Sequence, residues 1–187
     1  NRYKVDAVPH LICGGFTKEE TENALIDLQF LGIDNVLVLR GDARKADATF
    51  VPTPGGHAYA SGLLKQVTQM NQGKYLHQEH DDTFKTDFCI GVAGYPEKHF
   101  ESPNLKTDFK YLKKKIDLGA DFIVTQMFYD VQKYIDFVEQ CRKNDIHVPI
   151  IPGLKPITSS KQLVSLPKLF HIDVPEALSE AVSSCKS

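Results

Sequence analysis

The sequence predicts an α/β fold: a (β/α)8 TIM-type barrel, of which about five of the eight β/α units lie in this chain. Five short apolar runs alternate with amphipathic, helix-forming stretches along the 187 residues, the order typical of a parallel sheet covered by helices. Polar residues follow these runs at their carboxyl ends, where the active sites of barrels are built. Because a closed barrel typically needs ~250 residues, we expect residues 1–187 to form a single domain that is a partial barrel.

Five segments are expected to be strands because their apolar character is continuous, as in Val36-Leu37-Val38-Leu39, which favours burial on both faces. They are residues 7–13, 35–39, 88–93, 122–126 and 148–152. A doubly wound dinucleotide-binding sheet is the alternative. Its G-x-G-x-x-G turn would directly follow the first strand, where this chain reads Cys13-Gly14-Gly15-Phe16.

Capping residues mark the expected helices. Thr17 and Glu20 have the T-x-x-E spacing of a capping box, which predicts a helix start near residue 18, and Gly32 supplies a left-handed stop. Ser102, followed by a proline, suits the N-cap of a later helix, which Gly119 ends in the same way.

Apolar stripes on these helices predict the faces that pack. One stripe per helix is expected, at Thr21, Ala24, Leu25, Leu28 and Leu31, at Leu105, Phe109, Leu112 and Ile116, and at Tyr134, Phe137, Val138 and Cys141. Ile26 and Phe30 face nearly opposite to the first stripe. This second apolar surface could meet a neighbouring helix or another subunit.

Residues 43–87 interrupt the alternation and are interpreted as two inserted loops around a helical stretch at 57–71. The first loop could lie over the site as a lid or be a passive surface excursion. In the second, His77-Gln78-Glu79-His80 lacks the helical H-E-x-x-H arrangement of a zinc site. No metal is therefore expected.

Composition narrows the class of partner. The formal net charge is −2 and no basic face or tail is present, so we expect a small-molecule ligand and no nucleic acid. No run of 18 apolar residues occurs, and the first residues lead into a strand, so we expect no membrane partner and a cytoplasmic location. The four cysteines have no CxxC spacing, which favours buried thiols.

Two strand ends carry clusters of polar residues. Arg40-Gly41-Asp42 follows the strand at 35–39, and Gly41 would let a ligand approach the backbone closely; a structural Arg–Asp pair is the alternative. Tyr95-Pro96-Glu97-Lys98-His99 follows the next strand. Its tyrosine offers a stacking face and a hydroxyl, and His99 can donate to a phosphate or a flavin-type edge; a solvated loop is the alternative.

Other candidates come from the later units. Gln126 ends a buried run, and its amide can both donate to and accept from a heterocycle such as a pterin. Asp108, Tyr111 and Lys115 form a stripe at the edge of the core, where a lysine could neutralise phosphates. No spacing identifies a general acid and base among the available carboxylates, which are Asp42, Glu97 and Asp130.

Six segments, in order, have a recognisable pattern: Pro9-His10-Leu11-Ile12-Cys13, Leu39-Arg40-Gly41-Asp42, Tyr59-Ala60-Ser61, Val92-Ala93-Gly94-Tyr95-Pro96-Glu97-Lys98-His99, Thr125-Gln126-Met127-Phe128-Tyr129-Asp130 and Ile150-Ile151-Pro152-Gly153-Leu154-Lys155-Pro156. Together they resemble the flavin-dependent methylenetetrahydrofolate reductase family. The resemblance implies a (β/α)8 barrel with FAD at the carboxyl ends of its strands, and a homo-oligomer. By the family's strand order, this chain would hold the apparent third to seventh strands with their helices. It also implies that NAD(P)H reduces the flavin, which then converts 5,10-methylenetetrahydrofolate to 5-methyltetrahydrofolate in one-carbon and methionine metabolism.

The resemblance also implies roles for particular residues. The positions that would line the flavin site are His10, Arg40, Gly41, Asp42, Tyr59, Ala60, Ala93, Tyr95, His99, Asp108, Tyr111, Lys114 and Lys115. Lys114 lies off the stripe described above and rests on the resemblance alone. Gln126 and Gln162 would contact the folate, and Asp42 would lie where flavin and pterin meet, so Asp42 and Gln126 are the expected catalytic residues.

Two departures from the family pattern leave alternatives open. Leu166 stands where some members have a stacking Phe, and no segment matches the proton-donating Glu of the family's first strand, so we expect this chain to be inactive by itself. One alternative is a non-catalytic flavin- or phosphate-binding barrel fragment. Another is an unrelated aldolase-like barrel, in which Lys155 would be the candidate Schiff-base lysine.

Overall fold

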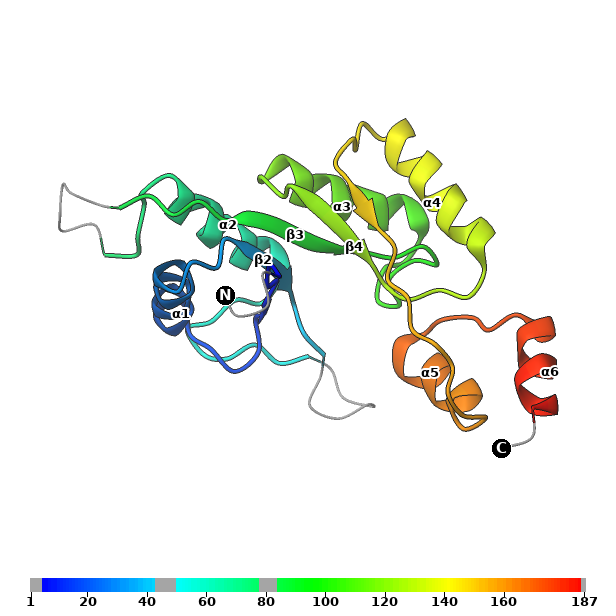
Figure 1. The fold of residues 1–187 in the computed structure, drawn as a ribbon. Coiled ribbons are helices and arrows are strands. Elements are labelled where there is room, and N and C mark those ends of the chain that lie inside the picture. The colour runs from blue at the N-terminus through cyan, green and yellow to red at the C-terminus, as the bar shows by residue number, and fades with distance from the viewer. Residues whose placement is uncertain (1–4, 43–49, 78–83, 186–187) are drawn as a thin grey trace. The chain divides into compact units, whose positions relative to one another are not determined.

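The computed structural model describes residues 5–42, 50–77 and 84–185 (Figure 1). Strands and helices alternate along them. The strands are β1 (His10–Ile12), β2 (Asn35–Leu39), β3 (Cys89–Gly94), β4 (Phe122–Thr125) and β5 (Ile150–Ile151). The helices are α1 (Lys18–Phe30), α2 (Ala60–Asn71), α3 (Leu105–Asp117), α4 (Val131–Lys143), α5 (Gln162–Phe170) and α6 (Glu176–Ser184).

The strands form one sheet in the order β1-β2-β3-β4-β5. Pairing is parallel between β1 and β2, β2 and β3, and β4 and β5. His10 is in register with Leu37 at one end of the sheet, and Ile123 with Ile150 at the other. Each strand is followed by a helix. The predicted α/β class is therefore confirmed, with five β/α units in series, as expected for part of a (β/α)8 barrel.

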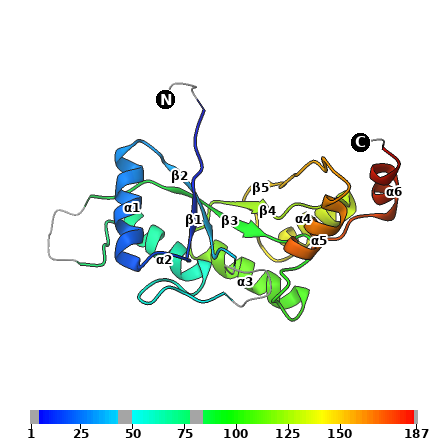
Figure 2. The ribbon, with the colours of Figure 1, turned by 90° about the horizontal axis from the view of Figure 1, so that it is seen from below.

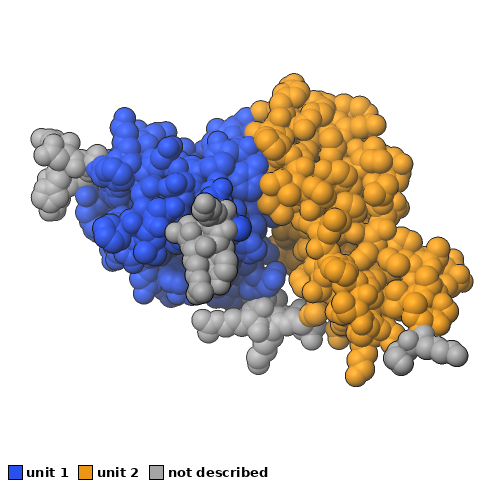
Figure 3. All heavy atoms as spheres, viewed as in Figure 1, with its two compact units in different colours: residues 1–93, 114–122 blue, residues 94–113, 123–187 orange. Residues whose placement is uncertain are grey.

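The chain divides into two compact units, which are coloured separately in Figure 3. Unit 1 comprises Asn1–Ala93 and Lys114–Phe122, and unit 2 comprises Gly94–Lys113 and Ile123–Ser187. Each unit has a buried apolar core of its own.

In unit 1 the core forms around β2 and α2. Val36 and Val38 of β2 are fully buried, as is Leu25 of α1. One face of α2 is also fully buried, at Leu63, Leu64, Val67 and Met70. Figure 2 shows α1 and α2 beside the strands of this unit. The two helices are tied together because the Gln66 side chain donates to the Lys18 carbonyl at 2.8 Å.

In unit 2 the core lies between α3, α4 and β4. The rings of Phe109 and Phe137 stack with centroids 5.6 Å apart, and Ile123 is fully buried. Gly94 fits against this cluster because a Cβ there would lie 2.7 Å from an Ile123 methyl carbon and 2.8 Å from the Phe137 ring. Continuous apolar packing thus explains both the buried strand and the glycine at the end of β3.

The capping signals of α1 are confirmed. The Thr17 hydroxyl accepts from the Glu20 amide at 3.1 Å, and the Glu20 carboxylate accepts from the Thr17 amide at 2.8 Å, which completes the capping box. Gly32 (φ 71°) and Gly119 (φ 104°) adopt the left-handed conformation predicted for the two helix stops.

The predicted start of α3 is wrong by two residues. The helix begins at Leu105 because the Asn104 side chain accepts from the Thr107 amide at 2.9 Å, which is the hydrogen bond of an N-cap. Ser102 and Pro103 lie in the preceding turn, where the Ser102 hydroxyl bonds Asp108 instead. Leu105 is consequently 52% exposed and does not join the predicted apolar stripe.

The first and last strands are shorter than predicted. Among the residues that the structure describes, β1 pairs with β2 alone and β5 with β4 alone, so each has one neighbour to extend its ladder. Prolines, which lack an amide donor, flank both: Pro9 precedes β1, and Pro149 and Pro152 surround β5. The prediction that β1 and β5 are buried on both faces is also wrong, since Ile12 is 41% exposed and Ile151 is 48% exposed.

The second apolar face of α1, which lies opposite the predicted packing stripe, is exposed. Phe30 is 89% exposed and Ile26 is 44% exposed. Leu31, predicted on the packed stripe, is instead 70% exposed because it lies beyond the last helical residue as the C-cap. Within the described ranges, no helix is long and apolar enough to cross a membrane.

The inserted segment between β2 and β3 is described in part. Its helix begins at Ala60 rather than at residue 57, after Tyr59 at the N-cap. Residues 43–49 and 78–83 lie outside the described residues. The first half of the predicted lid loop and most of His77-Gln78-Glu79-His80 therefore lie outside the described residues, whereas residues 50–56 of that loop are described and include a turn closed by the Gly56 amide, which donates to the Thr53 carbonyl at 2.8 Å.

Candidate active site

In unit 1 the carboxyl ends of β1 and β2 lie together. The Cys13 amide donates to the Arg40 carbonyl at 3.1 Å, and the Arg40 guanidinium lies 5.2 Å from the centre of the Phe50 ring. Gly41 has a φ of 84°, and a Cβ there would lie 3.3 Å from the Cβ of Ile12. Glycine is thus required by conformation as well as by space. Arg40 precedes this glycine and the exposed Asp42 follows it.

The other candidates of unit 1 come from β1, α2 and α3. His10 is exposed on β1, and Tyr59 is 67% exposed at the N-cap of α2, directly before Ala60. The Lys115 ammonium donates to the Ala93 carbonyl at 2.6 Å, so this pair is brought together. Lys114 of α3 is exposed.

A buried histidine that the sequence did not single out lies two residues before Tyr59. The His57 ring nitrogen Nε2 is 2.5 Å from the Gln66 side-chain oxygen. Because the Gln66 nitrogen donates to the Lys18 carbonyl, the oxygen must accept, and His57 carries its proton on Nε2. Burial lowers the pKa of His57, opposed by the Gln66 hydrogen bond and assisted by the charge of Lys18.

In unit 2 the segment after β3 forms a tight turn. The Lys98 amide donates to the Tyr95 carbonyl at 3.2 Å, which closes the turn over Pro96. The Tyr95 and His99 rings meet edge to face, with centroids 4.6 Å apart. Lys98 has a φ of 84°, and its ammonium donates to the carbonyls of His99 (2.9 Å) and Ser102 (2.5 Å). Tyr95 and His99, which the sequence analysis predicted to contact a ligand, are therefore brought together.

Asp108 connects this turn to α3. Its carboxylate accepts from the His99 amide at 3.0 Å and from the Ser102 hydroxyl at 2.8 Å. Asp108 lies at the edge of the core, as its stripe predicted, and the structure shows that it holds the turn. Tyr111 of the same stripe is 56% exposed.

A shallow pocket opens beside the turn. Gln126 lines it. Its backbone amide donates to the Gly94 carbonyl at 2.8 Å, and its side-chain oxygen accepts from the Met127 backbone amide at 2.9 Å. The lining residues are Tyr95, Pro96, Glu97, Lys98, Gln126, Met127, Phe170, His171 and Ile172. Gln126 and Tyr95, both predicted from the sequence as ligand contacts, thus line the same pocket.

Gln162, Leu166 and Lys155 are not among the residues that line this pocket. The Gln162 side chain accepts from the Thr158 amide at 2.6 Å at the start of α5, and Leu166 is buried, with 4% of its surface exposed. Lys155 is exposed, and its carbonyl accepts from the Tyr129 hydroxyl at 2.9 Å. A Schiff-base lysine is usually activated by desolvation, which this position does not provide.

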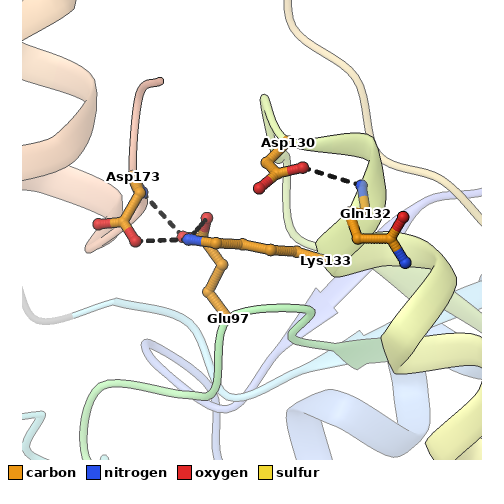
Figure 4. Close-up of polar contacts among 5 residues, drawn as sticks. All are labelled: Glu97, Asp130, Gln132, Lys133 and Asp173. Atoms are coloured by element: carbon orange, nitrogen blue, oxygen red, sulfur yellow. Dashed lines mark hydrogen bonds and ion pairs between the residues drawn. The ribbon is translucent and has the colours of Figure 1, made fainter. Parts of the chain in front are cut away.

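Glu97, Lys133 and Asp173 form an ion-pair cluster in unit 2 (Figure 4). Glu97 is recognisable from the sequence as an available acid, but its partners Lys133 and Asp173 are not, because they are 36 and 76 residues away. Although burial lowers the pKa of Lys133, hydrogen bonds to Asp173 and Glu97 outweigh it and raise that pKa above its ordinary value. No local spacing signals such a cluster.

The cysteines are divided between core and surface. Cys13 and Cys141 are buried, and burial raises the pKa of each to about 11, against the opposing charges of Arg40 and Arg142 respectively. Both thiols are therefore protonated at neutral pH. Cys89 and Cys185 are exposed, contrary to the expectation of buried thiols, because one begins a strand and the other ends a helix without buried residues. Across residues 5–42, 50–77 and 84–185, no cluster of three or more potential metal ligands occurs.

Comparison with known proteins gives a consistent result. The family model described as "Methylenetetrahydrofolate reductase" matches residues 1–187. Methylenetetrahydrofolate reductase 2 of Saccharomyces cerevisiae is 38% identical over 179 residues, which are 95% of this chain and 28% of the relative. Methylenetetrahydrofolate reductase (NADH) 1 of Arabidopsis thaliana is 37% identical over 191 residues, 97% of this chain and 30% of the relative.

A bacterial relative is shorter. The 5,10-methylenetetrahydrofolate reductase of Salmonella typhimurium is 33% identical over 183 residues, 95% of this chain and 53% of the relative. The chain therefore spans under a third of the two eukaryotic relatives and about half of the bacterial one. Since the family model matches its whole length, the chain belongs to the methylenetetrahydrofolate reductase family.

Proposed function

We propose that the protein containing this chain reduces 5,10-methylenetetrahydrofolate to 5-methyltetrahydrofolate with NAD(P)H, through FAD. The observation that carries the proposal is the match of the family model to residues 1–187; within unit 2, Gln126 and Tyr95 lie together beside a turn that also holds His99. Family membership gives this pocket its expected substrate. The name of the Arabidopsis relative supports a nicotinamide reductant.

The residues present fit a flavin dinucleotide by their chemistry. Arg40, Lys114 and Lys115 supply cations suited to a diphosphate, and Tyr59 and Tyr111 present exposed aromatic surfaces, at 67% and 56%, suited to flat ring systems. FAD, when bound, supplies a carrier that takes two electrons from one substrate and gives them to the next. The family resemblance supports a part in holding this group for these side chains and, within unit 2, for the Tyr95–His99 turn.

Gln126 and Asp42 have distinct roles in the proposal. The Gln126 amide carries two N–H donors in addition to the oxygen that accepts from Met127, so it can donate to acceptor atoms of a pterin. The exposed carboxylate of Asp42 would orient the pterin and tune the flavin potential. Gln162, at the start of α5, would contact the remainder of the folate.

Glu97 lines the same pocket as Gln126, but its bonding does not suit a proton donor. One of its oxygens accepts from the Lys133 ammonium and the other from the Asp173 amide. Both oxygens are occupied by these structural partners. The proposal therefore does not use Glu97 as the acid.

The test is made on the full-length protein. A bound flavin should show in its visible absorbance, and NADH or NADPH oxidation should depend on added methylenetetrahydrofolate. Bound flavin without folate-dependent oxidation would favour the non-catalytic flavin-binding alternative, and a protein without flavin would contradict the proposal. The isolated 187 residues are expected to be inactive; their turnover would contradict that expectation. The cytoplasmic location and homo-oligomeric state belong to the same proposal and rest on the resemblance.

A further inference from the structure

Three segments that are distant in sequence meet at the Glu97 carboxylate. Its side chain is only 10% exposed. Oε1 accepts from the Lys133 ammonium at 2.9 Å, and Oε2 accepts from the Asp173 backbone amide at 2.8 Å. Glu97 lies in the turn after β3, Lys133 on α4, and Asp173 between α5 and α6. Figure 4 shows the Lys133 side chain extended from α4 toward both carboxylates.

The α4 side of this cluster is fixed by its own helix start. Asp130 is the N-cap and accepts from the Gln132 amide at 2.9 Å, so Lys133 extends from the first turn of a helix with a defined beginning. The Lys133 ammonium also binds the Asp173 carboxylate at 2.5 Å. The lysine thus bridges a nearly buried acid and an acid whose side chain is 80% exposed.

The turn on the other side of the cluster needs external support. Lys98 has a φ of 84°, a conformation that is unfavourable for a side chain with a Cβ and persists where surrounding contacts impose it. Asp108 holds one end of the turn through the His99 amide. Glu97 holds the middle, because its carboxylate bonds both Lys133 of α4 and the Asp173 amide of the segment before α6.

We propose that Glu97 is a positioning residue of the flavin site: through Lys133 and the Asp173 amide, it holds the turn that presents Tyr95 and His99 to the flavin. The inference rests on the proposed function and deepens it. Its physical basis is preorganisation, because a turn already fixed in its binding conformation loses less conformational entropy when the ligand binds. Lys133 and Asp173 belong to this device without touching the flavin themselves.

The test uses the full-length protein, stripped of flavin and titrated with FAD. Glu97→Gln keeps the shape of the side chain but removes the charge, and its amide nitrogen cannot accept from either partner. We expect the FAD dissociation constant to rise about tenfold, with a changed visible circular dichroism spectrum of the bound flavin. Glu139→Gln is the matched control, because Glu139 also pairs with a lysine of α4, at 3.7 Å, but in an exposed position. It should bind FAD as the wild type does.

A second pair of variants separates positioning from a general loss of stability. Lys133→Arg retains a cation that can bridge both acids and should keep FAD affinity within about twofold, whereas Lys133→Met should weaken it. If Glu97→Gln does not fold, this pair decides: equal affinity of the Arg and Met variants overturns the proposal, and weaker binding by the Met variant alone supports it.

His99→Ala distinguishes the positioning role from the function on which it rests. Weaker FAD binding by His99→Ala, together with unchanged binding by Glu97→Gln and Lys133→Met, would overturn the positioning role and leave the proposed function standing. A wild-type protein that does not bind FAD would overturn both.

Discussion

Replacing Asp108 with alanine should loosen the turn at His99, whether or not a flavin is present. The Asp108 carboxylate accepts from the His99 amide at 3.0 Å and from the Ser102 hydroxyl at 2.8 Å. Hydrogen bonds to a charged group contribute about 1.5–3 kcal/mol each. Because the turn is partly exposed and water can replace some of this bonding, we expect a local loss of about 2–3 kcal/mol for the two together.

Hydrogen exchange measures this loss directly. At about 1.4 kcal/mol per factor of ten, the His99 amide should exchange about 30- to 150-fold faster in Asp108→Ala than in the wild type. The measurement is made on flavin-free protein, from peptides that span residues 95–104. Asp108→Asn keeps one accepting oxygen, so it should show an intermediate increase.

Asp136→Ala is the control for this experiment. Asp136 accepts from the exposed Gln132 side chain at 2.8 Å, and such a surface contact is worth less than about 0.5 kcal/mol. Exchange at His99 should therefore be unchanged. Protection that stays within about threefold of the wild type in Asp108→Ala would refute the reasoning, and would leave Asp108 only its proposed place beside the flavin.

Three other predictions concern pH and the proposed substrate site. Burial lowers the pKa of His57 below its ordinary value of 6.5; protonation therefore costs more in the folded state, and stability should be full above pH 6.5 and fall as the pH drops below it toward the folded pKa. His57→Gln should reduce the difference in urea midpoint between about pH 7.5 and about pH 5.5, and an unchanged difference would assign the acid sensitivity elsewhere. Asp42→Asn should slow the half-reaction with the folate more than reduction by NAD(P)H, as followed by stopped-flow flavin absorbance; equal slowing would contradict its place beside the pterin. Gln126→Ala should raise the KM for the folate in steady-state assays, whereas an unchanged KM with a lower Tm would indicate a purely structural role.

The parts of the fold that could be predicted are those set by neighbouring residues. Thr17 and Glu20 are three residues apart and bond each other, and Gly32 needs only its own backbone conformation. The start of α3 was missed because two plausible caps compete within three residues, and the choice of Asn104 depends on Ser102 bonding Asp108 instead.

Strand length depended on information that is not local. β1 has the continuous apolar character of β2, but among the described residues it has one neighbouring strand where β2 has two, and its side chains are less buried than those of β2. The candidate site divides in the same way. Strand-end residues such as Arg40 and Tyr95 follow from the pattern of the chain, whereas the partners of Glu97 come from elements 36 or more residues away.

The structure sharpens the choice among the three carboxylates that the sequence left as candidate acids. Asp130 accepts from the Gln132 amide as the N-cap of α4, and Glu97 is bonded through both oxygens to Lys133 and the Asp173 amide. Each would have to break a structural hydrogen bond to act on a substrate. Asp42 is exposed at the end of β2, directly after a glycine whose backbone only glycine readily adopts. Our proposal that Asp42 meets the substrate does not require such a rearrangement of Asp130 or Glu97, and the unequal slowing of the two half-reactions in Asp42→Asn tests it.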